Sequence, residues 1–369
     1  MRGTSRADRR PTVVVTGGSA GVGRAIAHEF ARHRWNVAVL ARGEAGLRGT
    51  VRDIHRAGGR ALAHQVDVAD SDAVMRAADE TVAAFGAIDV WVNVAMVTIY
   101  APVQQTTPEE YKRATEVTYL GQVYGTLAAL KHMTARDAGS IVCIGSALAY
   151  RSIPLQSSYC AGKAAVRGFL DSLRSELRHD RSHVRLTMVQ LPAVNTPQFD
   201  WARSRMPRRL EPVPPIYQPE AIARHVYRAA HDSPRELWIG FPTWKAILGS
   251  MVIPGWIDGY LARHGYRGEM TSQAAMAGRP DNLYDPVDTD PGAHGRFDRR
   301  AVSTVPAADP RWLKLGIAAA IGGAFLGGLA AVRSMGGRDH ARSARETQSA
   351  KFRRTRHGVS LHEPASGRR

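Results

Sequence analysis

Cysteine is almost absent from this sequence, and so is any apolar segment near its N-terminus. Of the 369 residues, two are cysteine, Cys143 and Cys160, so we expect no disulfide framework and favour a reducing compartment. Cysteine and histidine show no spacing typical of zinc ligands, and we therefore expect no metal. The first ten residues are polar and charged, which predicts a tail at 1–10 rather than a secretory signal.

Lysine is also scarce, although the chain is strongly basic. Lysine and arginine number 50 against 33 acidic residues, a formal charge of +17, and nearly all of the positive charge is arginine. Two interpretations stay open: attraction to an anionic surface (cofactor phosphates, membrane headgroups or nucleic acid), and a coding bias without function. Because no nucleic-acid-binding motif accompanies the charge, we expect no nucleic-acid partner.

Short apolar runs alternate with helical stretches from residue 11 to about residue 185. The runs predict strands at 12–16, 36–41, 61–66, 89–92, 140–144 and 184–189. Continuous apolar runs are typical of strands that are buried on both faces, and helices are predicted between them at 23–33, 72–85, 108–135 and 157–178. This alternation predicts an α/β fold, a Rossmann-type, doubly wound parallel sheet in a single domain.

The pattern changes after about residue 192. We expect the domain to span 11–270, with a substrate lid at about 195–265, followed by a Gly-, Pro- and Asp-rich linker at 271–310. Within the lid, the proline-rich stretch 208–219 predicts a mobile loop. The stretch 237–261 contains Trp238, Trp244 and Trp256, which suit a large apolar pocket, an interfacial surface, or ordinary core and subunit contacts.

One apolar run is long enough to raise the question of a membrane. Residues 315–332 are uncharged and near the lower length limit for crossing a bilayer, so we expect a C-terminal hydrophobic helix at 311–333. Gly323 and Gly327 have the spacing of small residues in packed membrane helices. A transmembrane helix and a soluble or amphipathic helix both stay open, and a basic, disordered tail is expected at 334–369.

A glycine-rich turn follows the first predicted strand and opens the first predicted helix. Gly17, Gly21 and Gly23 let the backbone turn sharply there and approach a pyrophosphate closely. The helix N-terminus then offers free N–H groups and a partial positive charge, so we expect Ser19 and Val22 to contact the cofactor as well. A glycine-rich turn without a ligand is the alternative.

The second predicted strand lacks an acidic residue at its end. An NAD site usually places a carboxylate there to bind the ribose 2′-hydroxyl, but this sequence has Ala41 followed by Arg42. A guanidinium suits a 2′-phosphate, so we favour NADP(H), while NAD(H) and a merely solvated Arg42 stay open. Asp67, at the end of the third strand, is expected to accept a hydrogen bond from the adenine amine, with Val68 beside it.

Tyr159 and Lys163 lie four residues apart on a predicted helix, so their side chains share one face. The pKa of a free phenol is about 10, too high for efficient proton transfer at neutral pH. A neighbouring ammonium and the positive nicotinamide of the oxidised cofactor would lower it, and Lys163 can also hold the nicotinamide ribose. Ser146, just after a predicted strand, can bind the substrate oxygen beside the tyrosine.

Taken together, these motifs resemble the short-chain dehydrogenase/reductase family, over about residues 11–194 and more weakly to about 267. The resemblance implies hydride transfer between a nicotinamide and an alcohol or carbonyl carbon, with Ser146, Tyr159 and Lys163 as catalytic residues. It implies a homo-oligomer, a dimer or tetramer. It also implies further cofactor contacts at Asn93, Ala95, Pro192, Val194 and Thr196.

Three positions depart from the family's pattern. Met96 stands where the family has a glycine after the fourth strand, and Ala193 replaces the glycine after Pro192. Thr118 stands where the family has an asparagine that holds a water in the proton relay from the lysine. Because a hydroxyl can also bind a water, Thr118 is kept as a catalytic candidate.

Three functional hypotheses follow. The leading one is an NADP(H)-dependent oxidoreductase for a small apolar alcohol or ketone, with its catalytic domain in the cytoplasm, where NADPH is. The second is a catalytically weak or inactive NADP-binding module that is tethered to a membrane. The third is a membrane-associated interaction protein whose basic tail recruits anionic lipids or partners.

Overall fold

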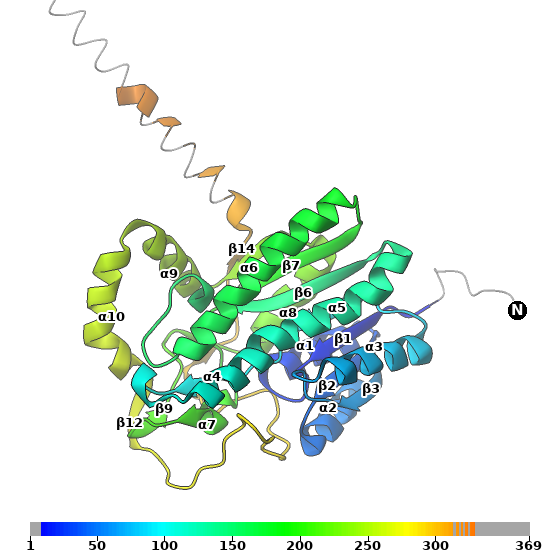
Figure 1. Ribbon diagram of the computed structural model, residues 1–369, viewed down its shortest axis with the longest axis horizontal. Helices are drawn as coiled ribbons and strands as arrows, with labels where there is room; N and C mark the ends of the chain where they lie inside the picture. Colours follow the sequence, from blue (N-terminus) through cyan, green and yellow to red (C-terminus); the bar gives the residue numbers. More distant parts are fainter. Residues whose placement is uncertain (1–8, 313–314, 317–318, 320–321, 324, 329–369) are drawn as a thin grey trace, which may run out of the picture. The chain divides into compact units, whose positions relative to one another are not determined.

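A central sheet joins eight of the described strands in the order β14-β11-β7-β6-β4-β1-β2-β3 (Figure 1). The computed structural model describes residues 9–312, 315–316, 319, 322–323 and 325–328. Every pairing in this sheet is parallel except that of β11 with β14. The strands are β1 (Thr12–Thr16), β2 (Asn36–Ala41), β3 (Arg60–Gln65), β4 (Val90–Asn93), β6 (Gly139–Ser146), β7 (Val184–Leu191), β11 (Glu236–Ile239) and β14 (Ala307–Ala308).

Helices cover both faces of this sheet. The core on one face gathers residues from α1 (Gly21–Arg32), α2 (Glu44–Arg56) and α8 (Pro219–Asp232). The other core takes residues from α3 (Ser71–Phe85), α4 (Pro108–Thr115), α5 (Gly121–Met133) and α6 (Ser157–His179). Along β1, Val13 and Val15 belong to the first core and Val14 to the second, because successive side chains of a strand point to opposite faces. The prediction of a doubly wound parallel sheet is confirmed.

The helix predicted at 108–135 is interrupted. A capping box between Thr107 and Glu110 starts α4, which ends at Thr115, and a π-helical turn, Glu116–Leu120, leads into α5. A single wide turn of this kind leaves no trace in the spacing of apolar residues, so the sequence predicts a continuous helix. The turn matters because it contains Thr118.

The lid region holds two helices, α9 (Phe241–Val252) and α10 (Pro254–Gly268). Pro242 and Pro254 lie in the first turns of these helices, where a missing N–H costs nothing, so they begin helices rather than interrupt one. The loop expected at 208–219 instead contributes two short strands to pairings: β9 with β12, and β10 with β13. The smaller strands and helix are β5 (Ile99–Tyr100), α7 (Gln198–Trp201), β8 (Arg203–Ser204), β9 (Arg208–Leu210), β10 (Ile216–Tyr217), β12 (Met270–Ala274) and β13 (Ala301–Val302).

Residues 271–310, for which the composition predicts a linker, pack onto the domain instead. We call residues 281–298 the strap. Within it, Leu283 is fully buried, and Asp290 forms ion pairs with Arg24 and Arg52. Asp288 accepts a hydrogen bond of 2.8 Å from the Ala45 amide at the start of α2. A segment with the composition of a loop can still pack on a domain, because its aspartates can cap helices and form ion pairs with arginines.

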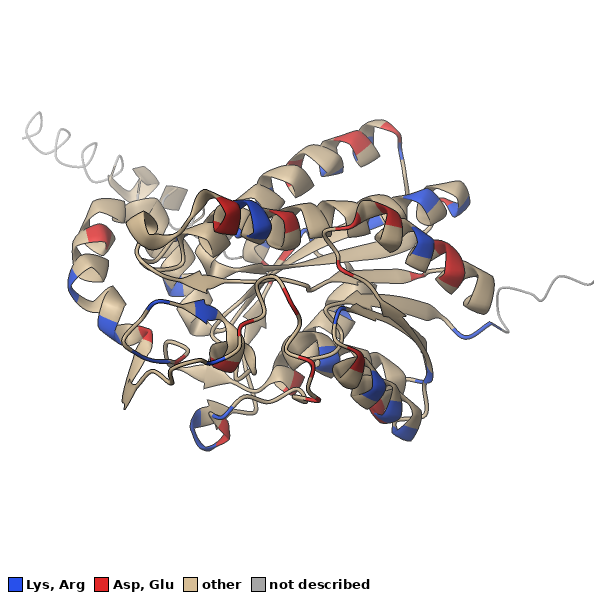
Figure 2. Ribbon diagram, turned by 60° about the horizontal axis from the view of Figure 1, so that its bottom comes forward, with Lys and Arg blue, Asp and Glu red and all other residues tan. Residues whose placement is uncertain are grey.

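Acidic and basic residues are interspersed over the outer helices in the view of Figure 2.

The first compact unit comprises residues 1–310, and a second comprises 311–369. The predicted membrane helix at 311–333 falls mostly, and the predicted basic tail at 334–369 entirely, outside the described residues. Among the residues that are described, no helix has the length and apolarity needed to cross a bilayer.

Candidate active site

A cavity of about 590 Å³ opens at the carboxyl ends of the central parallel strands. Its wall includes Gly17 after β1, Ala41 at the end of β2, Ser146 at the end of β6 and Leu191 at the end of β7. Strand order reverses at β1, which pairs with β2 on one side and β4 on the other. Such a switch point is where doubly wound sheets hold their ligands.

The glycine turn has the close backbone packing that a phosphate loop requires. A Cβ on Gly23 would lie 2.2 Å from the Gly17 carbonyl oxygen, and Gly17 itself has φ +66°. Ala20, the N-cap of α1, makes no side-chain capping bond, so the first amides of the helix lack a side-chain acceptor. The Gly21 N–H donates to the Gly292 carbonyl of the strap at 3.1 Å. The remaining amides at this end suit an anionic group.

Arg42 lies in the cavity wall, but its guanidinium contacts the strap. It donates to the backbone carbonyls of Asn282 at 2.5 Å and Tyr284 at 2.6 Å. These acceptors carry no full charge, and the ion pairs found among the described residues do not include Arg42. Asp67 also lines the cavity, and its carboxylate pairs with Arg113. The dinucleotide end therefore has a cation at its rim that no carboxylate contacts directly.

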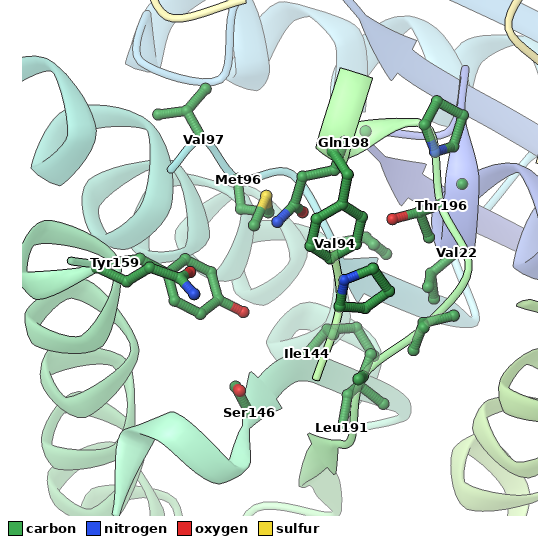
Figure 3. A pocket seen from close by; sticks show the side chains of 18 of the residues that line it. Val22, Val94, Met96, Val97, Ile144, Ser146, Tyr159, Leu191, Thr196 and Gln198 are labelled. Carbon is green, nitrogen blue, oxygen red and sulfur yellow. The ribbon is translucent and has the colours of Figure 1, made fainter. Parts of the chain in front are cut away.

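Tyr159 and Ser146 face each other across the other end of the cavity (Figure 3). Tyr159 comes from the first turns of α6, and Ser146 from the carboxyl end of β6, where its hydroxyl also accepts the Leu148 amide at 3.2 Å. Lys163, one turn further along α6, places its ammonium 5.6 Å from the centre of the Tyr159 ring. The ammonium donates to the Ile144 carbonyl at 2.6 Å, and the residue as a whole is 1% exposed.

Burial controls the protonation of this group. It raises the pKa of the Tyr159 phenol well above its ordinary value, against the opposite effect of a hydrogen bond with Ser146. It lowers the pKa of the Lys163 ammonium from 10.5 to about 8, because the lost hydration outweighs the opposite, smaller effect of Cys143. Burial therefore outweighs the influences that would lower the phenol's pKa. The phenol is protonated at neutral pH.

Two candidates lie outside this cavity wall. Thr118 is fully buried, and its hydroxyl donates to the Val97 carbonyl at 3.0 Å and accepts the Val97 amide at 3.1 Å. Asn93 accepts a hydrogen bond from the Trp91 indole at 2.8 Å and donates to the Gln122 carbonyl at 3.2 Å. Both side chains hold neighbouring backbone and core groups in place, and neither side chain is part of the cavity wall that the described residues form.

The other predicted cofactor contacts do line the cavity. Thr196 packs against the glycine turn, 3.1 Å from where a Cβ of Gly21 would lie, and Met96 faces the space above Ser146 (Figure 3). The remaining predicted residues in the wall are Ser19, Val22, Val68, Ala95, Pro192 and Val194.

Sequence reasoning missed several groups in the wall. The strap supplies Asn282, Pro286, Val287, Thr289 and Pro291, which have no motif that could have predicted them. Glu269, which follows α10 directly, is also in the wall; it is 1% exposed and accepts a hydrogen bond from Gln156 at 3.0 Å. Gln156 could have been suspected, since it lies three residues before Tyr159.

The fold and the site define a dinucleotide-binding α/β protein: a glycine turn at the switch point, with a tyrosine, a lysine and a serine at the far end. The chain belongs to the short-chain dehydrogenase family, whose model matches residues 11–206, more than half of its length. It is an NAD(P)-dependent oxidoreductase of the short-chain dehydrogenase/reductase type.

Individual relatives agree with this assignment. The "uncharacterized oxidoreductase YxnA" of Bacillus subtilis is 29% identical over 277 residues, 74% of this chain and 77% of that protein. A "3beta-hydroxysteroid dehydrogenase 1" of Eggerthella lenta is 34% identical over 228 residues, 60% of this chain and 87% of that one. A solved metagenomic short-chain oxidoreductase in complex with NADP is 29% identical, with TM-score 0.51 over 60% of this chain and 91% of that chain.

Proposed function

We propose that the chain interconverts an apolar ketone and its alcohol with NADP(H), using Tyr159 as the proton donor and acceptor. The observation that carries the proposal is the cavity itself, which joins the glycine turn at one end to the facing hydroxyls of Tyr159 and Ser146 at the other. A hydride source bound along this path would meet a substrate oxygen that both hydroxyls can reach.

Each residue at the far end has a distinct task. Ser146 orients the substrate oxygen by a hydrogen bond, and Tyr159 gives that oxygen a proton in reduction or takes one in oxidation. A bound nicotinamide would supply or accept the hydride at the carbon attached to this oxygen. Lys163 also lines the cavity, with its ammonium 5.6 Å from the centre of the Tyr159 ring, and its role is to hold the nicotinamide ribose and to favour the phenolate electrostatically.

The protonated state of the Tyr159 phenol favours reduction of a ketone at neutral pH. The buried phenol keeps its proton there, so Tyr159 is ready to donate it to a carbonyl oxygen. Oxidation of an alcohol needs the phenolate, and burial disfavours that form. The rate of oxidation should therefore rise with pH above neutrality, whereas reduction should not.

The proposed cofactor is NADP(H). Ala41 offers no carboxylate for a ribose 2′-hydroxyl, and the Arg42 guanidinium at the rim contacts carbonyls rather than acids. A 2′-phosphate would be a stronger acceptor for this guanidinium than the uncharged carbonyls of the strap. The NADP complex of the metagenomic relative supports the same choice.

The substrate end supports an apolar ligand. Its lining includes Leu148, Ile153, Phe199, Val213 and Leu261. The relative from Eggerthella lenta carries the name of an enzyme for an apolar polycyclic alcohol, which agrees with this class. The proposal also includes assembly of the chain into a homo-oligomer, which sedimentation equilibrium can test.

The test is Tyr159→Phe, which removes the phenol oxygen and leaves the ring. With NADPH and methyl ketones of six to ten carbons, we expect kcat to fall by about 10²–10⁴-fold, since general acid catalysis contributes that much. The Kd of NADPH, followed by its fluorescence, should change less than about threefold, because the ring keeps its packing. Undiminished turnover by Tyr159→Phe would refute the proposal.

A second function is favoured by one observation. Thr118 uses its hydroxyl on the Val97 backbone, so a proton relay through this side chain is not formed. A module that binds the cofactor with little or no turnover is therefore the alternative. It predicts tight NADPH binding by the wild type together with no ketone reduction across the same series.

A further inference from the structure

A buried carboxyl group that follows helix α10 shares the cavity with Tyr159. Glu269 lies between α10 and β12, far from every motif of the sequence, and its backbone carbonyl accepts the Glu211 amide at 2.9 Å. Its side chain lines the cavity, although the residue is 1% exposed. The carboxyl is therefore part of the substrate end and not of the outer surface.

The carboxyl has a partner on one oxygen and none on the other. Gln156 donates to Oε2 at 3.0 Å, and the Gln156 amide oxygen accepts a hydrogen bond from Thr98 at 3.3 Å. Oε1 is buried and has no hydrogen-bond partner in the part of the chain that the structure describes. Buried polar atoms without a partner are rare and cost free energy, which a ligand that supplies the partner would offset.

Helix α6 relates the position of the Glu269 carboxyl to that of Tyr159. Gln156 is the N-cap of α6 and Tyr159 is its third residue, so the same end of one helix carries the phenol and the hydrogen-bond partner of the carboxyl, and both Glu269 and Tyr159 line the cavity. Tyr100, which is 2% exposed, interacts electrostatically with both Glu269 and Tyr159. No basic side chain forms an ion pair with Glu269 among the described residues. Burial raises the pKa of the Glu269 carboxyl to about 8, so it is mainly neutral at pH 7.

We propose that Glu269 is a specificity-determining residue that binds a second, uncharged oxygen of the substrate, a hydroxyl or a carbonyl, away from the reacting carbon. This inference rests on the proposed function and adds to it the substrate class: an apolar ketone or alcohol with a second oxygen. A neutral carboxyl can donate a hydrogen bond to a carbonyl and accept one from a hydroxyl, so both groups fit Oε1. A ketone without the second oxygen leaves this site unpaired.

The experiment compares ω-hydroxy methyl ketones of six to ten carbons with the plain methyl ketones of the same length. With NADPH, the wild type should prefer the hydroxy ketone in kcat/KM by about tenfold at the chain length that reaches Oε1. Glu269→Leu should abolish this preference by lowering the value for the hydroxy ketone only. Glu269→Gln keeps an acceptor and a donor and should retain part of the preference.

Glu211→Gln is the matched control. Glu211 lines the same cavity, but its carboxylate is paired with Arg300, so the preference should stay at the wild-type ratio. An unchanged preference in Glu269→Leu, or an equal loss for both substrates, would overturn the inference, since the second result indicates a structural role.

The two proposals can fail separately. Kd values for ω-hydroxy and plain alcohols of the same lengths are measured on Tyr159→Phe with NADPH bound, with and without Glu269→Leu. A preference in Kd that needs Glu269, together with no ketone reduction by the wild type, would support the subsite and refute the proposed function. Turnover without any effect of Glu269 on Kd would do the reverse.

Discussion

At the scale of single residues, burial without a countercharge is the physical feature that links Tyr159, Lys163 and Glu269. Each has a pKa displaced toward its neutral form, with desolvation as the largest cause. At pH 7 the phenol and the Glu269 carboxyl are therefore mainly neutral, whereas Lys163, with a pKa of about 8, still carries most of its positive charge. Such a site suits a neutral substrate and leaves the charge that develops during reaction to be stabilised by the bound cofactor and by Lys163.

Glu269 makes the stability of the protein depend on pH. Its folded pKa of about 8 exceeds the unfolded value of 4.5, so between these values the unfolded state has lost a proton that the folded state keeps. Folding stability must then fall as pH rises from about 5 to 8. Glu269→Gln should remove this loss and raise Tm by a few degrees at pH 8, on the order of 1–2 kcal/mol, with little change at pH 5.

Calorimetry at the two pH values measures this effect. Glu211→Gln, which removes an ion pair with Arg300, should gain no stability at pH 8 and serves as the control. A Tm difference between Glu269→Gln and the wild type that is the same at pH 5 and pH 8 would contradict the assignment of a neutral carboxyl.

The proposed preference for NADP(H) depends on Arg42. Arg42→Ala removes the cation at the rim, so the affinity for NADPH should fall about 10- to 100-fold while that for NADH stays nearly constant. Arg48→Ala, on the exposed side of α2 where Arg48 pairs with Glu44, should change neither Kd. Equal losses for both cofactors in Arg42→Ala would show that its bonds to the strap matter more than a 2′-phosphate.

At the scale of elements, the strap is the feature that the sequence hides. Its Asp290 pairs with Arg24 of α1 and Arg52 of α2, and the Gly292 carbonyl accepts the Gly21 amide of the glycine turn. The strap therefore ties the two helices that flank the dinucleotide end. It also buries Leu283 and Phe297, which contribute about 1.5–3 kcal/mol each to folding.

Two truncations separate the strap from the chain beyond it. A protein that ends at Pro310 keeps the first compact unit and should retain the Tm and the turnover of the full chain. A protein that ends at Pro280 loses the strap and β14 and should lose more than about 3 kcal/mol of stability. Thermal melts and NADPH titrations of both proteins check this. Equal behaviour of the two would contradict a structural role for the strap.

At the scale of the whole molecule, the sequence predicts the sheet and the catalytic end well, because both depend on local signals. The ranges predicted for β1 and β2 agree with the structure, since their continuous apolar residues are buried on both faces. Tyr159 and Lys163 needed only helical spacing to be placed together.

Contacts between segments that are distant in the sequence could not be predicted from it. The partners of Arg42 and of Asp290 are more than 200 residues away, and nothing in their own neighbourhoods specifies them. Thr118 was assigned to the relay from its position in a family pattern, yet the π-helical turn directs its hydroxyl to the Val97 backbone. Burial, which sets the pKa values in the site, is likewise a property of the folded whole.

The most direct measurement follows the hydride itself. NADPH deuterated at C4, on each face in separate reactions, is incubated with the protein and a methyl ketone, and the alcohol is analysed by mass spectrometry. We expect that one of the two labels reaches the carbinol carbon and that Tyr159→Phe, which still binds NADPH, forms almost no labelled alcohol. Alcohol without deuterium from either face, or full labelling by Tyr159→Phe, would contradict this expectation.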